Sequence, residues 1–509
     1  MSKDQNPFVE IPQEEAEILD LAHEEALRYR GDAFSEMLEQ MPDPDFERDA
    51  RLALRIAERV RQAGGRVLVV GGFVRDMVMR RYGYGKTSKD IDLEIYYLDK
   101  EGLMDVLQEV AGDPAVLNEL GMKSRIAIDE VGKQFGVLVM LGLDIAVTRR
   151  DSRTKQGQGR KPDVVCDPTM EPEQAAFRRD LTINSMGMDP LTGEIIDNYG
   201  GMQDIKSGTI RHIYDGDPSN TQFGDDPLRV LRVMQFAARF DYDVASETVE
   251  LCRETDLSKL AKERVGEEWN KLMLKSTNVK KGLEAAREIG VLDKLHPEFS
   301  ASVSDKESWE NLLQTMEQAV RASDRDSLGL LRKKRLLYET LLLRVKNPKK
   351  FLTEIKATKD DANAIFSLLE IAKSIDLDPK EILSDEQIRK LSFAAGKIQS
   401  GVCFQDLLYL LWMKNFRETN EDERDELRNA DPMVLKIAKR AKELHVFDAS
   451  PKCILDGADL KMLGISQGEK MGEILRKTME MQLKGVFDNE DFFPQKDLAI
   501  TWVKENFGL

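Results

Sequence analysis

The chain has 509 residues, a net charge of -17 and a hydrophobic fraction of 41%, and we expect several domains because single cores stop growing near ~250–300 residues. No apolar run approaches the ~18 residues of a membrane span and the N-terminus lacks a signal pattern, which predicts a cytoplasmic protein without membrane contact. The acidic balance disfavours broad electrostatic binding of nucleic acid, but it allows a local basic track and a transient polynucleotide substrate.

The N-terminal part of the chain predicts surface helices and no metal site. Residues 1–50 are rich in Glu and Asp and carry apolar residues at helical spacing, and residues 51–62 continue as an amphipathic helix that ends before Gly64 and Gly65. Across the whole chain the four cysteines (Cys166, Cys252, Cys403 and Cys453) lack metal-ligand spacing. They therefore predict reduced thiols rather than a zinc site.

A strand, a glycine turn and a helix follow one another from Arg66 to Arg81. Residues 66–70 are an apolar, β-branched run typical of a buried strand, Gly71 and Gly72 break it, and the segment VRDMVMRR has a helical composition. The backbone N–H groups of a glycine turn can approach an anion closely, and a helix N-terminus adds partial positive charge. This pattern therefore predicts a phosphate-binding turn.

Acidic residues alternate with apolar ones in the next predicted strand. Asp90, Asp92 and Glu94 share one face if the segment DIDLE is a strand. Two carboxylates this close together favour a divalent cation. The stretch as a whole therefore predicts a metal-dependent nucleotide site.

The following segments predict a helix, two strands and a basic loop. The helix is expected over residues 100–111 and the strands over residues 124–129 and 135–148. The second strand carries Asp144, which either supplies a third carboxylate beside Asp90 and Asp92 or pairs with a neighbouring arginine. The segment DSRTKQGQGRKPDVV has no apolar period and predicts a mobile loop whose charge suits phosphate or RNA.

Charged residues return after Phe177, where we expect a helix to start. A hairpin-like turn is expected at residues 189–193. Further on, Asp225 and Asp226 are placed to cap a helix that begins at Pro227. Arginines recur on one face of that helix, where they either contact nucleotide or RNA or form salt bridges; they are Arg229, Arg232 and Arg239.

The remainder of the chain predicts helices and no strand. Amphipathic spacing indicates helices over residues 265–274, 281–289, 309–321, 328–343, 362–372 and 404–414. Pro, Ser and Asp accumulate near residues 300–306, 376–385 and 448–452, which predicts joints between helical domains.

Four motifs in this order resemble those of the class II tRNA nucleotidyltransferase family of the DNA polymerase β-like superfamily, which includes CCA-adding enzymes and bacterial poly(A) polymerases. They are GGFVRD, DIDLEIY, RRDLTIN and DDPLRVLRVMQFAARF, and the segment CILDGADLKMLGISQGEKMGEIL is similar to the tRNA-facing tail of the family. The resemblance implies an α+β head with a mixed five-stranded sheet, followed by all-α domains. It divides the chain into an acidic extension (1–50), head (51–215), neck (216–300), body (301–447) and tail (448–509).

The resemblance also implies roles in the transfer of a nucleotide. Asp90 and Asp92 would hold Mg²⁺, with Asp144 as the third carboxylate, and the triphosphate would lie at Gly71, Gly72 and Arg75. The ribose would be recognised by the motif residues Arg178, Arg179, Asp180 and Asn184.

Base recognition would fall to Asp226 and Arg229, with Arg232 nearby. A carboxylate accepts from the exocyclic amine of cytosine or adenine, and a guanidinium donates to the adjacent ring nitrogen, which excludes uracil and guanine. The motif commonly begins with Glu where this chain has Asp225. The body is expected to lack the His-Asp metal site of some bacterial relatives, because residues 308–321 carry none of its ligands.

The sequence thus predicts an enzyme that adds CCA, or part of it, to tRNA 3′ ends from CTP and ATP. A poly(A) polymerase is disfavoured because the C-terminus is acidic to neutral rather than basic. A CC-only or A-only enzyme stays open, since the loop over residues 148–162 decides much of that difference. A non-catalytic RNA-binding scaffold is disfavoured because binding alone needs no metal carboxylates.

Overall fold

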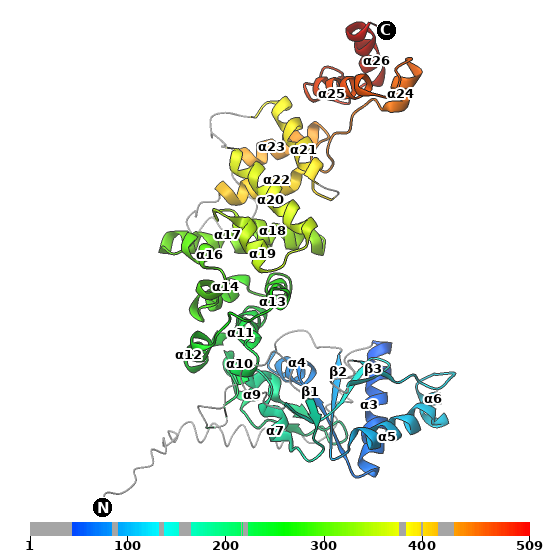
Figure 1. Ribbon diagram of the computed structural model, residues 1–509, viewed down its shortest axis with the longest axis vertical. Coiled ribbons are helices and arrows are strands. Elements are labelled where there is room, and N and C mark those ends of the chain that lie inside the picture. The colour runs from blue at the N-terminus through cyan, green and yellow to red at the C-terminus, as the bar shows by residue number, and fades with distance from the viewer. Residues whose placement is uncertain are drawn as a thin grey trace, which may run out of the picture. The chain divides into compact units, whose positions relative to one another are not determined.

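The computed structural model describes residues 43–83, 90–131, 137–151, 164–214, 216, 222–375, 383–398, 401–415 and 432–508. Two compact units can be distinguished along the chain (Figure 1). The first comprises the described residues up to Val233 together with Tyr242–Thr255, and the second comprises Met234–Asp241 and the described residues from Asp256 onward. Most of the predicted acidic extension lies outside the described residues, and the five-part division stays a prediction.

The first unit is an α/β head. Its elements are α3 (Pro44–Gln62), β1 (Arg66–Val70), α4 (Gly72–Arg81), β2 (Ile91–Tyr96), α5 (Lys100–Gly112), α6 (Pro114–Glu119), β3 (Asp129–Val131), β4 (Val137–Met140), β5 (Leu143–Val147), β6 (Arg149–Asp151), β7 (Val164–Cys166), α7 (Pro172–Phe177), α8 (Thr182–Ser185), β8 (Gly187–Met188), β9 (Ile195–Ile196), α9 (Gly201–Ser207), β10 (Thr209–Ile210), α10 (Gln222–Asp225), the start of α11 (Leu228–Phe240), β11 (Asp243–Val244) and α12 (Ser246–Glu254).

The head is built on a mixed sheet with the strand order β3-β4-β5-β2-β1-β8-β9. β2 and β5 run parallel, whereas β1 pairs antiparallel with both β2 and β8. The mixed α/β head is therefore confirmed. The sheet has seven strands among the described residues rather than the expected five, because strands as short as β3 and β9, of 3 and 2 residues, extend its two edges.

Helices cover both faces of this sheet. α3 begins at an Asp43 cap, buries an apolar stripe that includes Leu52 and Ile56, and contacts β1, β2 and α5 (Figure 1). On the other face Leu68, Val70 and Tyr96 form an apolar cluster with residues from α7 and the turn before it. The even-numbered residues of β1 and β2, Asp92 among them, therefore point to this same face of the sheet.

Several local predictions for the head were wrong. The strand expected over 124–129 is absent except for Asp129, which begins the edge strand β3. The strand expected over 135–148 is two strands, because Leu141 (φ 53°) and Gly142 turn the chain between β4 and β5. A Cβ on Gly142 would clash with the Asp49 carboxylate, so a larger residue at this turn would have to displace that side chain. Phe177 ends a helix rather than starting one.

Two further segments form strands where the sequence predicted none. β11, which lies beyond Asp241, pairs with β10. The sequence did not predict it because a strand of two residues is too short to show an alternating pattern. The ends of the predicted basic loop pair as β6 and β7, while residues 152–163 of that loop lie outside the described residues. The hairpin at 189–193 is confirmed, because β8 and β9 flank a turn in which Gly193 N donates to Asp189 O at 2.8 Å.

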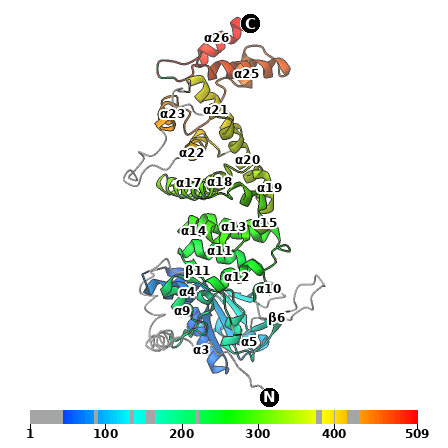
Figure 2. The ribbon, with the colours of Figure 1, turned by 90° about the vertical axis from the view of Figure 1, so that its left-hand side faces the viewer.

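The second unit is helical. Besides the end of α11, its elements are α13 (Lys262–Lys275), α14 (Val279–Glu288), α15 (Val291–Leu295), α16 (Pro297–Ser302), α17 (Lys306–Arg325), α18 (Leu330–Leu342), α19 (Pro348–Glu354), α20 (Lys359–Ser374), α21 (Asp385–Ile398), α22 (Phe404–Asn415), α23 (Pro432–Glu443), α24 (Gly457–Met462), α25 (Glu469–Leu483) and α26 (Lys496–Phe507). The six predicted helices correspond to α13, α14, α17, α18, α20 and α22. α17 and α18 lie side by side (Figure 2).

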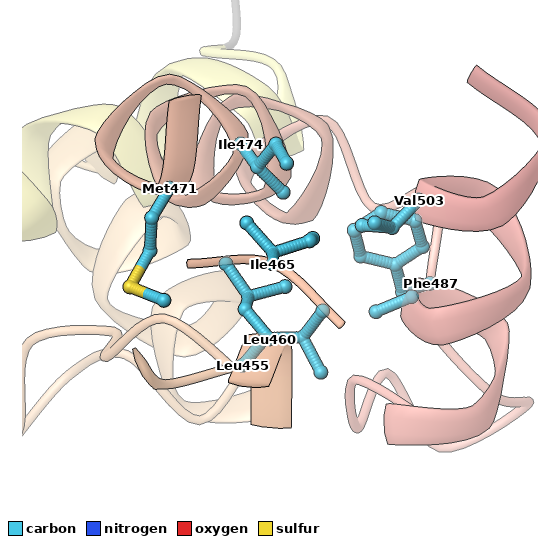
Figure 3. Close-up of a cluster of buried hydrophobic side chains, with 8 residues drawn as sticks. Leu455, Leu460, Ile465, Met471, Ile474, Phe487 and Val503 are labelled. Atoms are coloured by element: carbon cyan, nitrogen blue, oxygen red, sulfur yellow. The ribbon is translucent and has the colours of Figure 1, made fainter. Parts of the chain in front are cut away.

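The last three helices enclose a small core of their own (Figure 3). Asp456 caps α24, and its side chain accepts from Ala458 N at 2.8 Å and from Asp459 N at 3.0 Å. The buried side chains of this core are Leu455, Leu460, Ile465, Met471, Ile474, Phe487, Ala499 and Val503.

No helix in the described part of the chain has the length and apolar character needed to cross a membrane.

Candidate active site

The glycine turn after β1 is formed as the sequence predicts. Gly71 has φ 75° and ψ −132°, a conformation that only glycine adopts readily, and it is the N-cap of α4. No side chain caps α4 at Gly71, and the N-terminus of the helix is the positive end of its dipole. A methyl group on Gly71 would lie 3.7 Å from both Asp92 Oδ2 and Arg179 Nη1. The turn, a carboxylate and a guanidinium therefore meet at one place.

The predicted carboxylates converge on the same face of the sheet. Asp92 of β2 and Asp144 of β5 are directly paired in the parallel register, which points their side chains to the same side. Asp90 comes just before β2, and its charge acts on Asp92 together with that of Asp144. Partial burial, with repulsion from Asp144 and Asp90, raises the pKa of Asp92 to about 6, and Arg179 opposes this shift.

The carboxylates concentrate negative charge but are not arranged as a formed metal centre. Within the described ranges no three His, Cys, Asp or Glu side chains are arranged so that they could hold a metal ion. The donor set nevertheless suits a hard divalent cation, because it consists of carboxylate oxygens that repel one another without a counter-charge.

Arg179 joins the glycine turn to the neighbouring part of β2. Its Nη2 atom donates to Glu94 Oε2 at 2.9 Å, and its Nη1 atom donates to the Asn184 carbonyl at 3.3 Å. The same Glu94 oxygen accepts from the Tyr96 hydroxyl at 2.8 Å. Burial and the adjacent Glu94 raise the pKa of Tyr96 above its ordinary range, so its hydroxyl stays protonated and donates. Arg179, Glu94 and Tyr96 also line a small hollow on this face.

The RRDLTIN motif forms a buried polar network. Arg75 is 3% exposed and donates to Asp76 and, at 2.7 Å, to Asn184 Oδ1. Asn184 donates in turn to Asp180 Oδ1 at 3.0 Å. Arg232 donates to the other oxygen of Asp180, so α4, α8 and α11 are tied together.

The charge of Asp180 is maintained inside this network. Burial alone would raise the pKa of Asp180, but Arg232, the Asn184 amide and Arg229 together hold it below its ordinary value. Asp180 therefore stays an anion, although its side chain is 8% exposed.

The start of α11 lies against the same motif. Asp226 caps the helix by accepting from Leu228 N at 3.3 Å, whereas Asp225 ends α10. Arg229 donates to the main-chain carbonyls of Arg178 at 2.6 Å and of Arg179 at 3.1 Å. Burial lowers the pKa of Arg229. The two residues expected to recognise the base thus flank the residues expected to hold the ribose.

The structure brings most of the predicted site residues together, and two residues to which the sequence gave no role, Glu94 and Tyr96, lie among them. Glu94 and Tyr96 follow Asp92 on the same face of β2, so the period of two that pointed to Asp92 also pointed to them. Arg75 lies inside the network rather than at its surface.

Two parts of the chain match known family models. Residues 67–211 match the model described as Poly A polymerase head domain. Residues 241–302 match the model described as Probable RNA and SrmB-binding site of polymerase A. The first match contains the glycine turn, the carboxylates and the RRDLTIN motif.

Curated relatives are similar over part of their length. The chain is 33% identical over 277 residues to the Multifunctional CCA protein of Psychromonas ingrahamii, covering 51% of this chain and 59% of the relative. It is 35% identical over 247 residues to the Multifunctional CCA protein of Haemophilus influenzae, covering 46% and 51%. The chain thus spans little more than half of these relatives.

Solved structures share the fold over most of the chain. A Bacillus stearothermophilus CCA-adding enzyme in complex with CTP has a TM-score of 0.60 and 18% identity, with 92% of this chain and 99% of that chain covered. A Thermotoga maritima CCA-adding enzyme complexed with tRNA has a TM-score of 0.56 and 19% identity, with 92% and 98% covered. These structures confirm the fold, and the family models and curated relatives confirm the predicted resemblance to CCA-adding enzymes and poly(A) polymerases.

Proposed function

We propose that the chain is a template-independent RNA nucleotidyltransferase that adds CCA, or part of it, to tRNA 3′ ends from CTP and ATP. The observation that carries this proposal is the convergence of the in-register pair Asp92 and Asp144 with the Gly71 turn and the Arg179 guanidinium. In the reaction the primer 3′-hydroxyl attacks the α-phosphate, a new phosphodiester bond forms, and pyrophosphate leaves. The CCA-adding enzymes of similar fold support the choice of substrate.

The carboxylates are proposed to hold Mg²⁺. Asp90 and Asp92 would be the ligands, with Asp144 as a further one. Asp144 is paired with Asp92 in the sheet, and besides burial the charges of Asp144 and Asp90 both raise the pKa of Asp92. A bound Mg²⁺ neutralises phosphate charge and makes the primer hydroxyl easier to deprotonate.

The remaining residues are proposed to position the nucleotide. The N–H groups at Gly71 and Gly72 and the Arg179 guanidinium would bind the triphosphate, because they form the positive side of the site. Arg75 would act through Asn184, since Asp76 and Asn184, which accept hydrogen bonds from its guanidinium, are both buried.

Ribose and base recognition are proposed for the adjoining motif. Asp180 and Arg178 would lie at the ribose and its phosphate, with Arg232 keeping Asp180 ionised. Asp226 and Arg229 would meet the base edge, where each bidentate contact discriminates by about 1–3 kcal/mol. Arg229 is held near Arg178 and Arg179 by their carbonyls, so base and ribose recognition would be coupled.

The helical unit is proposed to bind the tRNA. Most of residues 241–302, which match the RNA-binding model, belong to this unit, and its last three helices enclose a core of their own. All four cysteines are free thiols, which suits the cytoplasmic location that we propose with this function.

The test uses three tRNA transcripts, one lacking CCA, one ending in CC and one with the mature end. Each is incubated with labelled CTP or ATP and Mg²⁺. Incorporation of both nucleotides followed by arrest supports full CCA addition, whereas incorporation of one of them supports a CC-only or A-only enzyme. A failure of all three substrates would refute the enzyme proposal.

A poly(A) polymerase is the second candidate, because the descriptions of the two matching family models name Poly A polymerase and polymerase A. Its signature in the same assay would be unlimited addition of A to the mature end.

A further inference from the structure

We infer that Glu94, supported by Tyr96, is a positioning residue that holds Arg179 at the glycine turn for the incoming triphosphate. This inference rests on the proposed function and deepens it. It concerns two residues of β2 that lie beyond the carboxylates and would not themselves touch the reacting atoms.

The geometry fixes Arg179 from two sides. Glu94 Oε2 accepts from Nη2 at 2.9 Å, and the Asn184 carbonyl accepts from Nη1 at 3.3 Å. The Gly71 turn lies next to Nη1, since a methyl group there would stand 3.7 Å from it. Arg179 thus presents one edge of its guanidinium to the turn while the other edge is bound to Glu94.

Tyr96 fixes Glu94 in the same way. Its ring is 1% exposed within the apolar cluster of β1 and α7, and its hydroxyl donates to the oxygen that Arg179 uses. A buried ring has one orientation, so the hydroxyl fixes the carboxylate and the carboxylate fixes the guanidinium.

The placement along β2 explains why Glu94 does not join the metal carboxylates. Glu94 shares the face of Asp92 but lies two residues further, about 7 Å along the strand. Arg179 also acts electrostatically on Asp92, but its guanidinium donates a hydrogen bond to Glu94. The Arg179 guanidinium therefore offers phosphate a cationic position that is separate from the metal carboxylates.

The test compares four variants with the unmodified protein. Glu94→Gln keeps the shape and removes the charge, Tyr96→Phe removes the hydroxyl, Arg179→Lys removes the fork, and the fourth combines Glu94→Gln with Arg179→Lys. Tyr97→Phe is the matched control, because the Tyr97 hydroxyl donates to another carboxylate, Glu171, at 2.8 Å on the protein surface. Binding of CTP and of ATP is measured without tRNA, and KM and kcat are measured with it.

We expect Glu94→Gln to raise the Kd and the KM for nucleotide about tenfold, which corresponds to the loss of one charge-assisted hydrogen bond. Tyr96→Phe should have a smaller effect in the same direction, with kcat nearly unchanged in both, and Tyr97→Phe should have none. The combined variant should be no worse than Arg179→Lys alone, because Glu94 acts through Arg179.

Additive losses in the combined variant would overturn the inference. So would a lower melting temperature with unchanged Kd and KM, since that is the result of a purely structural pair. If the unmodified protein binds nucleotide but transfers none, the proposed function fails while the binding measurements still test the positioning role.

Discussion

The Gly71 turn offers the most direct test of the site. In the variant Gly71→Ala an L residue must adopt φ 75° and ψ −132°, which costs about 1–3 kcal/mol for a side chain in such a glycine-only region. The new methyl group would meet Asp92 Oδ2 and Arg179 Nη1 at 3.7 Å, an ordinary contact distance, so no clash adds to this strain.

The cost should appear in stability and, more strongly, in transfer. Each kcal/mol lowers the melting temperature of a domain of this size by about 2–4 °C. The methyl group also stands where a phosphate would approach the backbone, so we expect transfer to fall about 10- to 100-fold. Thermal unfolding and single-turnover incorporation of labelled CTP measure the two effects.

Gly64→Ala separates strain from position. Gly64 has φ 86° and no atom within 4 Å of its added Cβ, so alanine there adds backbone strain at the end of α3 without a new contact. It should lower the melting temperature and leave transfer intact at temperatures where the protein is folded. Normal transfer by Gly71→Ala, or an equal loss in Gly64→Ala, would refute the reasoning.

Three other predictions concern charge, pH and helix packing. Asp92→Asn should reduce nucleotide transfer about 100-fold or more. It should not lower the melting temperature, because it removes a negative charge that burial and Asp144 disfavour. Preserved activity in incorporation assays would contradict the role of Asp92. His296 is buried, accepts from Trp269 Nε1 at 3.0 Å and has a lowered pKa because burial disfavours its charged form. The folded state therefore resists protonation of His296. The stability that the neutral imidazole contributes is present above the ordinary pKa near 6.5 and should be lost as the pH falls below it. Melting curves at several pH values should show that the melting temperature of His296→Gln depends less on pH. Gly266→Ala should destabilise the second unit by about 1–3 kcal/mol, because the new Cβ would clash with the Ile355 carbonyl. Gly472→Ala has open space in α25 and should stabilise the protein by about 0.5–1 kcal/mol. Denaturant unfolding measures both free energies.

The sequence alone determined the features that depend on local patterns. Helical spacing predicted the long helices of the second unit, and the β-branched run before Gly71 predicted β1, because burial of one face imposes a period on the chain. Alternation in DIDLE placed Asp92 and Glu94 on one face for the same reason. The order of the four motifs then indicated the family.

Only the tertiary structure decided which of these side chains meet. The register between β2 and β5 puts Asp92 beside Asp144, although 52 positions separate them in the chain, and no local pattern specifies that pairing. The burial of Arg75 and the pairing of Glu94 with Arg179 likewise depend on long-range contacts of the RRDLTIN motif with α4 and β2. Local periodicity fixes the face on which a residue lies, whereas long-range packing fixes its partner.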